Sequence, residues 1–286
     1  MSSTLYDTPG PVTRRRTLYG SIAGAVLILI ILGVAISRLA SKGAFEGELW
    51  EVLTQPALQR LLLRGLLATL QAAAVAMLLA MLLGAVLAVG ALSRRGWLSR
   101  PVSLWVELFR GLPLLLLILF AYLGLPQIGI EVSTFWALVI GLTLYNSAVI
   151  SEIFRAGILS LPRGQSEAAE AIGLRRGQVL RIVLIPQAVR LMLPALISQG
   201  VTLLKDTSLG FVISYSELLR SGRGAVEFLG GRYSIPVYTA IAVVYIGTCA
   251  GLSWVARWTD KRMSARYGKT VAAPAAATAD AGAGVT

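Results

Sequence analysis

The sequence contains no histidine and only one cysteine, Cys249, among its 286 residues. The lack of histidine excludes an imidazole general base and any histidine-bound metal ion. A single cysteine excludes a disulfide or a cysteine metal site within one chain. We therefore expect no catalytic site, no metal site and no cofactor bound by this chain.

Charged residues are also scarce: they make up 14% of the chain, compared with about 25% in a typical soluble protein. Hydrophobic residues make up 56%, and the mean hydropathy is +0.74. The apolar residues form long runs, which argues against a large soluble α/β enzyme. A net charge of +12 suits nucleic acid binding in a soluble protein, but here the arginines cluster between the apolar runs. The composition therefore predicts an all-α membrane protein.

Six apolar runs are long enough to cross a bilayer core of roughly 30 Å. They are Leu18–Ser37, Leu61–Leu92, Val102–Leu125, Thr134–Ile158, Pro186–Leu204 and Ile235–Ala256. The first run follows the basic sequence TRRR and has a signal peptide as its alternative interpretation. Its length, and the lack of a clear cleavage site after it, favour a retained helix.

The distribution of positive charge predicts the orientation of these spans. Segments 1–20, 93–101, 159–178 and 257–286 carry twice as many Lys and Arg residues as segments 37–60, 126–133 and 205–234. Cytoplasmic loops carry the excess of positive charge, so we expect both termini of this multi-pass protein to be cytoplasmic. We divide the chain into a cytoplasmic segment 1–17, an extra helix with an external loop 18–60, a transmembrane domain 61–258, and a disordered cytoplasmic tail 259–286.

The predicted cytoplasmic loop 159–184 contains an unusual motif, E-A-A-x-x-x-G. The motif is formed by Glu167, Ala168, Ala169 and Gly173, and Pro186 follows it at the start of the next span. We expect Ser166 to cap a short helix, the alanines to leave its surface smooth, and Gly173 to permit a left-handed turn or close approach. A plain loop with one helical turn is the alternative for any single part of this pattern.

With its full spacing, the loop resembles the signature of permease subunits of binding-protein-dependent ABC importers. The family signature ends I-x-L-P, whereas this chain has Val183, Leu184, Ile185 and Pro186. Further segments resemble the polar amino acid subfamily: GLLATLQAA (65–73), VELFRGLPLLL (106–116), SEIFRAGILSLPRGQSEAAEAIGL (151–174), IPQAVRLMLPALISQGVTLLKDTSL (185–209) and SELL (216–219). Within that subfamily, the chain is most similar to actinobacterial glutamate permease subunits, which carry a similar extra helix.

The resemblance implies a five-helix type I importer core (MetI-like) plus one extra N-terminal transmembrane helix, in a bacterial plasma membrane. It implies a second permease subunit, the same or a sister chain, two ATPase subunits that each take one coupling helix, and an extracellular amino-acid-binding protein. ATP and Mg²⁺ would be bound by the ATPase, and this chain has no G-x-x-x-x-G-K-[ST] loop. The alternative is a secondary amino acid transporter driven by an ion gradient, which needs carboxylates near the bilayer midplane.

Two charge patterns lie within or beside the spans. ELFRG and EIFRA place Glu107 and Arg110, and Glu152 and Arg155, at spacings that share a helix face. We expect either Glu107–Arg155 or Glu152–Arg110 to bridge two helices at an inner gate, with pairing inside each helix as the alternative.

The second pattern, at the outer end of the fifth span, comprises Lys205, Asp206, Thr207 and Ser208. We expect these residues to line a substrate vestibule, where the two signs of charge would serve an amino acid. A solvated helix end is the alternative.

Overall fold

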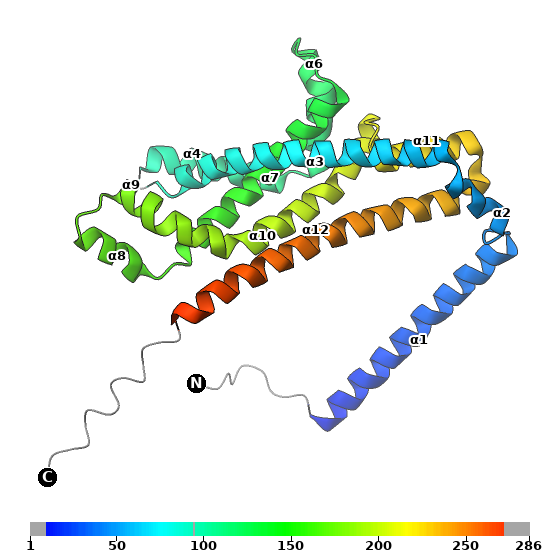
Figure 1. The fold of residues 1–286 in the computed structure, drawn as a ribbon, viewed down its shortest axis with the longest axis horizontal. Helices are drawn as coiled ribbons and strands as arrows, with labels where there is room; N and C mark the ends of the chain where they lie inside the picture. Colours follow the sequence, from blue (N-terminus) through cyan, green and yellow to red (C-terminus); the bar gives the residue numbers. More distant parts are fainter. Residues whose placement is uncertain (1–9, 94, 272–286) are drawn as a thin grey trace.

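The computed structural model describes residues 10–93 and 95–271, and every regular element within them is a helix. Four long helices make up the body: α3 (Pro56–Ala91), α7 (Thr134–Leu159), α10 (Ile185–Asp206) and α12 (Ser234–Val271) (Figure 1). The short helices α8 (Arg163–Ala171) and α9 (Arg176–Gln178) lie at one end, and α2 (Gly47–Trp50) and α11 (Leu218–Leu229) lie at the other (Figure 1). The E-A-A-x-x-x-G motif is therefore at the end of the molecule opposite to α11.

The number of spans agrees with the prediction when one bent pair of helices is counted as a single span. Within the described residues, five helical stretches are long and apolar enough to cross a membrane, and the bent pair gives up to six. The five are Pro11–Ser41, Pro56–Ala91, Thr134–Leu159, Val179–Ile213 and Gly231–Val255. The predicted all-α membrane fold is confirmed.

The third predicted span, Val102–Leu125, is not one continuous helix. The chain forms α4 (Gly96–Gly111) and then a second helical stretch, Leu114–Gln127, bent by 100° from the first. The break has a local cause, because Leu112 precedes Pro113 and is extended, with φ −80° and ψ 136°. A residue before proline avoids the helical region, and proline has no N–H to continue the helix.

Small side chains allow α3 and α7 to pack closely. Ala72, Ala76 and Ala80 of α3 are fully buried. A Cβ atom added to Gly84 of α3 would lie 2.9 Å from the carbonyl oxygen of Ser147 on α7, so only glycine fits there. Helices in membranes associate through such close backbone contacts, since lipid removes the hydrophobic driving force between them.

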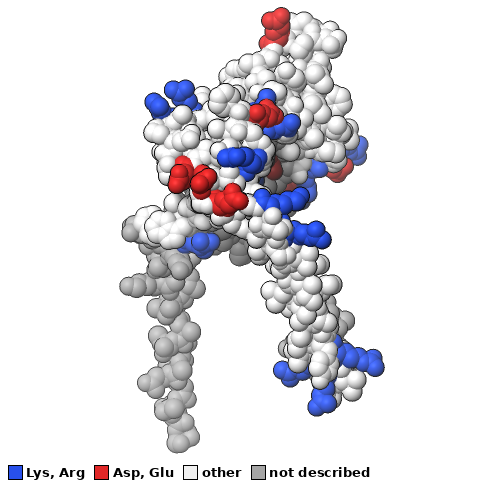
Figure 2. Space-filling view, turned by 90° about the vertical axis from the view of Figure 1, so that its right-hand side faces the viewer, with Lys and Arg blue, Asp and Glu red and all other residues white. Residues whose placement is uncertain are grey.

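The N-terminal helix α1 (Pro11–Ser41) extends away from the body and has no buried residue. Its middle is uncharged, and basic side chains gather at its far end (Figure 2). The chain packs against the body after α1, where Val52 and Leu58 are buried in one apolar cluster with residues of α11 and α12. A helix that is apolar on all sides suits a lipid environment, as expected for the extra transmembrane helix.

The predicted terminal segments are described only in part. Helix α1 begins at Pro11, inside the segment 1–17, and α12 continues to Val271, past residue 259, where we place the start of the tail. Residues 1–9 and 272–286 lie outside the described residues. The disorder of the tail and the cytoplasmic location of both ends stay predictions.

Candidate functional site

Helix α8 carries the E-A-A-x-x-x-G motif and ends in a hydrogen-bonded turn that requires glycine. The N–H of Leu174 donates to the carbonyl oxygen of Ala169 at 3.2 Å, and the N–H of Gly173 donates to that of Glu170 at 2.9 Å. This pair of bonds is the Schellman motif, whose glycine adopts the left-handed conformation. Gly173 has φ +86°, so the predicted left-handed turn is confirmed.

The start of α8 differs from the prediction. Pro162 occupies the N-cap position and the helix begins at Arg163, so Ser166 lies inside the helix and does not cap it. The reason is that Pro162 fixes its own φ at −57°, next to the first helical residue, and starts the helix one turn earlier.

The exposed surface of α8 combines small side chains with carboxylates. Ala168, Glu167 and Glu170 are exposed, whereas Ala169 is buried. The other end of the loop joins α10 through a π-helical stretch, η3 (Val179–Leu184), and Pro186 is the second residue of α10. A side-chain hydrogen bond of 3.4 Å from Gln187 of α10 to Gln165 of α8 connects the two helices. Helices α8 and α10 are therefore joined by a side-chain contact as well as through the chain.

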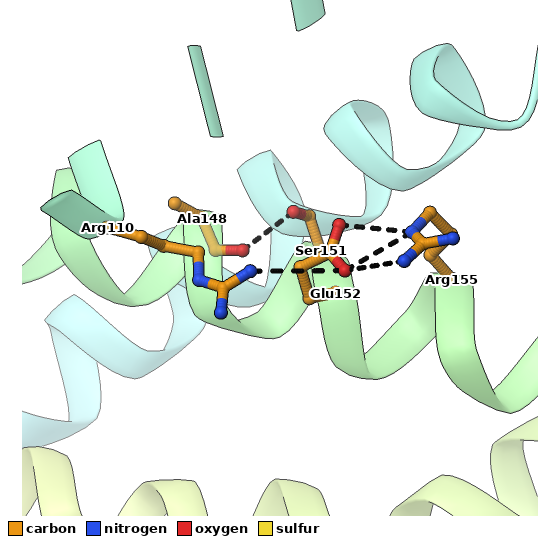
Figure 3. Close-up of polar contacts among 5 residues, drawn as sticks. All are labelled: Arg110, Ala148, Ser151, Glu152 and Arg155. Carbon is orange, nitrogen blue, oxygen red and sulfur yellow. Dashed lines mark hydrogen bonds and ion pairs between the residues drawn. The ribbon is translucent and has the colours of Figure 1, made fainter. Parts of the chain in front are cut away.

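The predicted charge cluster is present in part (Figure 3). The Glu152 carboxylate accepts hydrogen bonds from Arg155 in its own helix, the shortest being 2.8 Å from Nη2. It also lies 3.9 Å from Nη1 of Arg110 on α4. The structure therefore combines the predicted Glu152–Arg110 bridge with the alternative of pairing within one helix.

The other predicted bridge, Glu107–Arg155, does not form. Glu107 is exposed on α4 and makes no ion pair with any described residue. The guanidinium of Arg155 is instead bound to Glu152, one turn earlier in α7. An ion pair within one helix does not depend on how closely a second helix approaches. Arg155 therefore pairs with Glu152 of its own helix and not with Glu107 of α4.

The four residues at the end of α10 separate into two pairs. Lys205 and Ser208 line a cavity of about 610 Å³ between α10 and α12. Asp206 and Thr207 are not among the lining residues. The buried Thr207 hydroxyl donates to the Leu204 carbonyl oxygen at 2.6 Å and so belongs to the helix end. Three further residues with polar side chains or sulfur line the cavity: Tyr245, Cys249 and Ser253.

A buried carboxylate lies behind this cavity, and the sequence did not single it out. Glu217 is fully buried and caps α11, accepting hydrogen bonds from the N–H groups of Leu219 at 2.8 Å and Arg220 at 2.7 Å. The hydroxyl of Tyr245 donates to the same carboxylate at 2.8 Å. The sequence signal was an acid directly before an amphipathic helix, which is typical of an N-cap but does not predict burial.

The chain matches the family described as "Binding-protein-dependent transport system inner membrane component" over residues 76–265. The chain belongs to this family. The match runs from α3 to α12 and includes α8, the charge cluster and the cavity, while α1 lies outside it.

Several proteins are similar to this permease. The probable glutamine ABC transporter permease protein GlnP of Bacillus subtilis is 39% identical over 168 residues, which cover 58% of this chain and 77% of the relative. The glutamate transport system permease protein GluD of Corynebacterium glutamicum is 48% identical over 142 residues, which cover 49% of this chain and 52% of the relative. A crystal structure of an amino acid ABC transporter with histidines is 32% identical, with a TM-score of 0.68, and covers 73% of this chain and 97% of that one.

Family membership confirms the predicted permease and its role in transport rather than catalysis. It also shows that the alternative of a secondary transporter driven by an ion gradient is wrong. The inward-facing MetNI methionine ABC transporter, 22% identical with a TM-score of 0.62, supports the MetI-like fold alone.

Proposed function

We propose that this chain is the permease subunit of an ABC importer that carries a polar amino acid, with glutamate as the main cargo, and that partner ATPase subunits drive it through α8. The relatives support an amino acid cargo, because they are named as glutamine and glutamate permeases. The 48% identity to the corynebacterial glutamate permease favours glutamate.

The observation that carries the coupling proposal is the geometry of α8 in a chain of this family. The helix lies at the end of the body, Ala168 is exposed on it, and a Cβ atom added at Gly173 would meet nothing within 4 Å. A short helix with small exposed side chains fits a groove on another protein, and its fixed ends transmit a displacement. In the assembly that we propose, two permeases, identical or sister chains, each insert α8 into one ATPase subunit.

The same proposal assigns the remaining parts of the importer. ATP and Mg²⁺ bind to the ATPase subunits, and an extracellular binding protein delivers the amino acid. Both termini and α8 then face the cytoplasm, while α2 and α11 face the binding protein.

A bulky substitution on α8 tests this function. In proteoliposomes that contain the permease, its ATPase and its binding protein, Ala168→Trp lowers glutamate uptake and stimulated ATP hydrolysis about tenfold, the effect of losing one good interface contact. Ala35→Trp makes the same change at an exposed alanine of α1 and leaves both rates unchanged. Full coupling in Ala168→Trp would falsify docking through this surface.

The cavity between α10 and α12 is the proposed stretch of the translocation path. Its volume of about 610 Å³ lies within the range of ligand sites, roughly 300–1,000 Å³. Lys205 supplies a cation for a carboxylate, and Ser208 supplies a hydroxyl that both donates and accepts. Asp206 and Thr207 support the helix end that presents these two residues.

The cluster around Glu152 is the proposed inner gate. Its Arg110 contact crosses from α4 to α7, and the 3.9 Å distance leaves this contact weaker than the 2.8 Å contact with Arg155. A weak bridge between helices breaks at small cost when the helices move, while Arg155 continues to neutralise Glu152. Glu107 contributes an exposed charge beside the bridge.

A further inference from the structure

The buried carboxylate of Glu217 has hydrogen bonds but no counter-cation. Three donors reach it, and it makes no ion pair with any Lys or Arg that the structure describes. The nearby Arg220 instead pairs with Glu227 at 3.7 Å. The three donors favour the ionised form of this carboxylate, and no described cation neutralises the negative potential that this form produces at the wall beside it.

Two of the three donors belong to the wall of the α10–α12 cavity. Leu219, whose N–H donates to Glu217, lines the cavity, and so does Tyr245, whose hydroxyl donates to the same carboxylate. The Glu217 carboxylate is therefore directly behind this wall and is held in place by it. The cap also fixes the first turn of α11, so the carboxylate cannot turn away.

The cavity wall thus has charge of both signs near it. Lys205 is the cation among the lining residues, and Glu217 is the anion behind the part of the wall formed by Leu219 and Tyr245. Asp206, the other acid near this end of α10, is not among the lining residues.

We propose that Glu217 makes this cavity selective for an ammonium group, so that it takes a zwitterionic amino acid with its ammonium toward Tyr245 and a carboxylate toward Lys205. This inference rests on the proposed function, since it concerns the same cavity. Glu217 acts through the wall and does not touch the cargo. A dicarboxylate without an amino group gains the Lys205 contact but meets a negative potential at the other side.

Cys249 provides a direct measure of cavity occupancy, because it is the one cysteine of the chain and lines the cavity. The full-length permease in lipid nanodiscs is treated with a small uncharged thiol reagent, and the rate of Cys249 modification is measured against ligand concentration. The two ligands are glutamate and glutarate, which share both carboxylates and differ in the ammonium group. Glutamate protects Cys249 at a concentration about tenfold lower than glutarate does, because its ammonium group is attracted by the charge of Glu217 behind the wall.

The neutral variant Glu217→Gln tests the role of the carboxylate. The proposal predicts that the difference between glutamate and glutarate falls to within about twofold, with glutarate protection kept or improved. Glu217→Ser is the second neutral variant, because serine is a strong N-cap residue and keeps α11 started without a charge. Glu217→Asp, which keeps both the cap and the charge, restores the preference for glutamate. Glu131→Gln neutralises an exposed acid that is not among the cavity-lining residues, and this control keeps the full preference.

Failure of the proposed path and failure of the Glu217 role give different results. If glutamate does not protect Cys249 at all, the cavity is not a cargo site and the proposed path is wrong. If glutamate protects Cys249 and its preference over glutarate persists in the neutral Glu217 variants, or is lost in Glu131→Gln instead, the role assigned to Glu217 is overturned while the path stands.

Discussion

The side-chain amide of Gln199 on α10 donates a 2.7 Å hydrogen bond to the side-chain oxygen of Asn146, a fully buried residue of α7. The Asn146 amide in turn donates to the Leu142 carbonyl oxygen at 2.8 Å. The two helices are therefore joined inside the spans by a polar contact that hydrocarbon cannot replace.

Breaking this contact on one side is predicted to destabilise the permease. Gln199→Leu leaves the buried Asn146 oxygen without its donor, which costs about 1–2 kcal/mol. Thermal unfolding in detergent measures the loss as a lower Tm. In the double variant Asn146→Leu/Gln199→Leu both polar groups are removed, and part of the stability returns. Additive losses in the double variant would show that the two residues act independently.

Gly173 is predicted to be needed for coupling because of its backbone conformation. Its φ of +86° strains any other residue, so Gly173→Ala costs about 1 kcal/mol and loosens the end of α8. The rate of stimulated ATP hydrolysis falls in this variant. It falls less in Gly173→Asn, because asparagine tolerates the left-handed region. Gly164→Ala, inside α8 with open space around it, is the matched control and keeps wild-type activity. Equal effects of the alanine substitutions at both glycines would contradict this explanation.

The Arg110–Glu152 contact is predicted to show energetic coupling, and the Glu107–Arg155 pair is not. Double-mutant cycles with glutamine measure each interaction in transport assays. We expect a coupling of about 0.5–1 kcal/mol for Arg110 and Glu152, which are partly exposed and 3.9 Å apart. Strict additivity for Arg110 and Glu152, or strong coupling between Glu107 and Arg155, would contradict the gate as the structure places it.

Lys205 is predicted to bind a carboxylate of the cargo. Lys205→Gln raises the glutamate concentration needed to protect Cys249 about tenfold, since a charge-assisted contact is lost. The same substitution weakens the protection of Cys249 by glutarate to a similar degree, because both ligands contact Lys205 through a carboxylate. Arg232→Gln removes an exposed cation that is not among the cavity-lining residues and leaves protection unaltered. Unchanged protection in Lys205→Gln removes Lys205 from the proposed path.

The sequence predicts the parts of this fold that depend on local pattern. The apolar runs locate the spans, and the spacing around Glu167 and Gly173 predicts a short helix that ends in a left-handed turn. The bend at Pro113 was also a local signal, but the long apolar run around it concealed the break. Hydropathy therefore identifies the segment that crosses the membrane, but it does not show whether that segment is one continuous helix.

The tertiary contacts were harder to predict from the sequence. The spacing of Glu107, Arg110, Glu152 and Arg155 allowed two bridges between helices, and only the approach of α4 to α7 selects Arg110. Glu217 has an ordinary sequence context, and its burial results from α3, α11 and α12 meeting around it. Which side chain faces a cavity depends on such long-range packing, so Lys205 and Ser208 could not be separated in advance from Asp206 and Thr207.

Docking of α8 on the ATPase can be detected by cross-linking in the assembled importer. In a Cys249→Ser background, Ala168→Cys places one thiol on α8, and Phe228→Cys places one at the opposite end, where Phe228 is 89% exposed. A short bifunctional thiol reagent is applied to the assembled importer, whose ATPase carries cysteines around its surface groove. We predict a cross-link from position 168 to the ATPase and none from position 228. A cross-link from position 228, or none from position 168, would contradict the account.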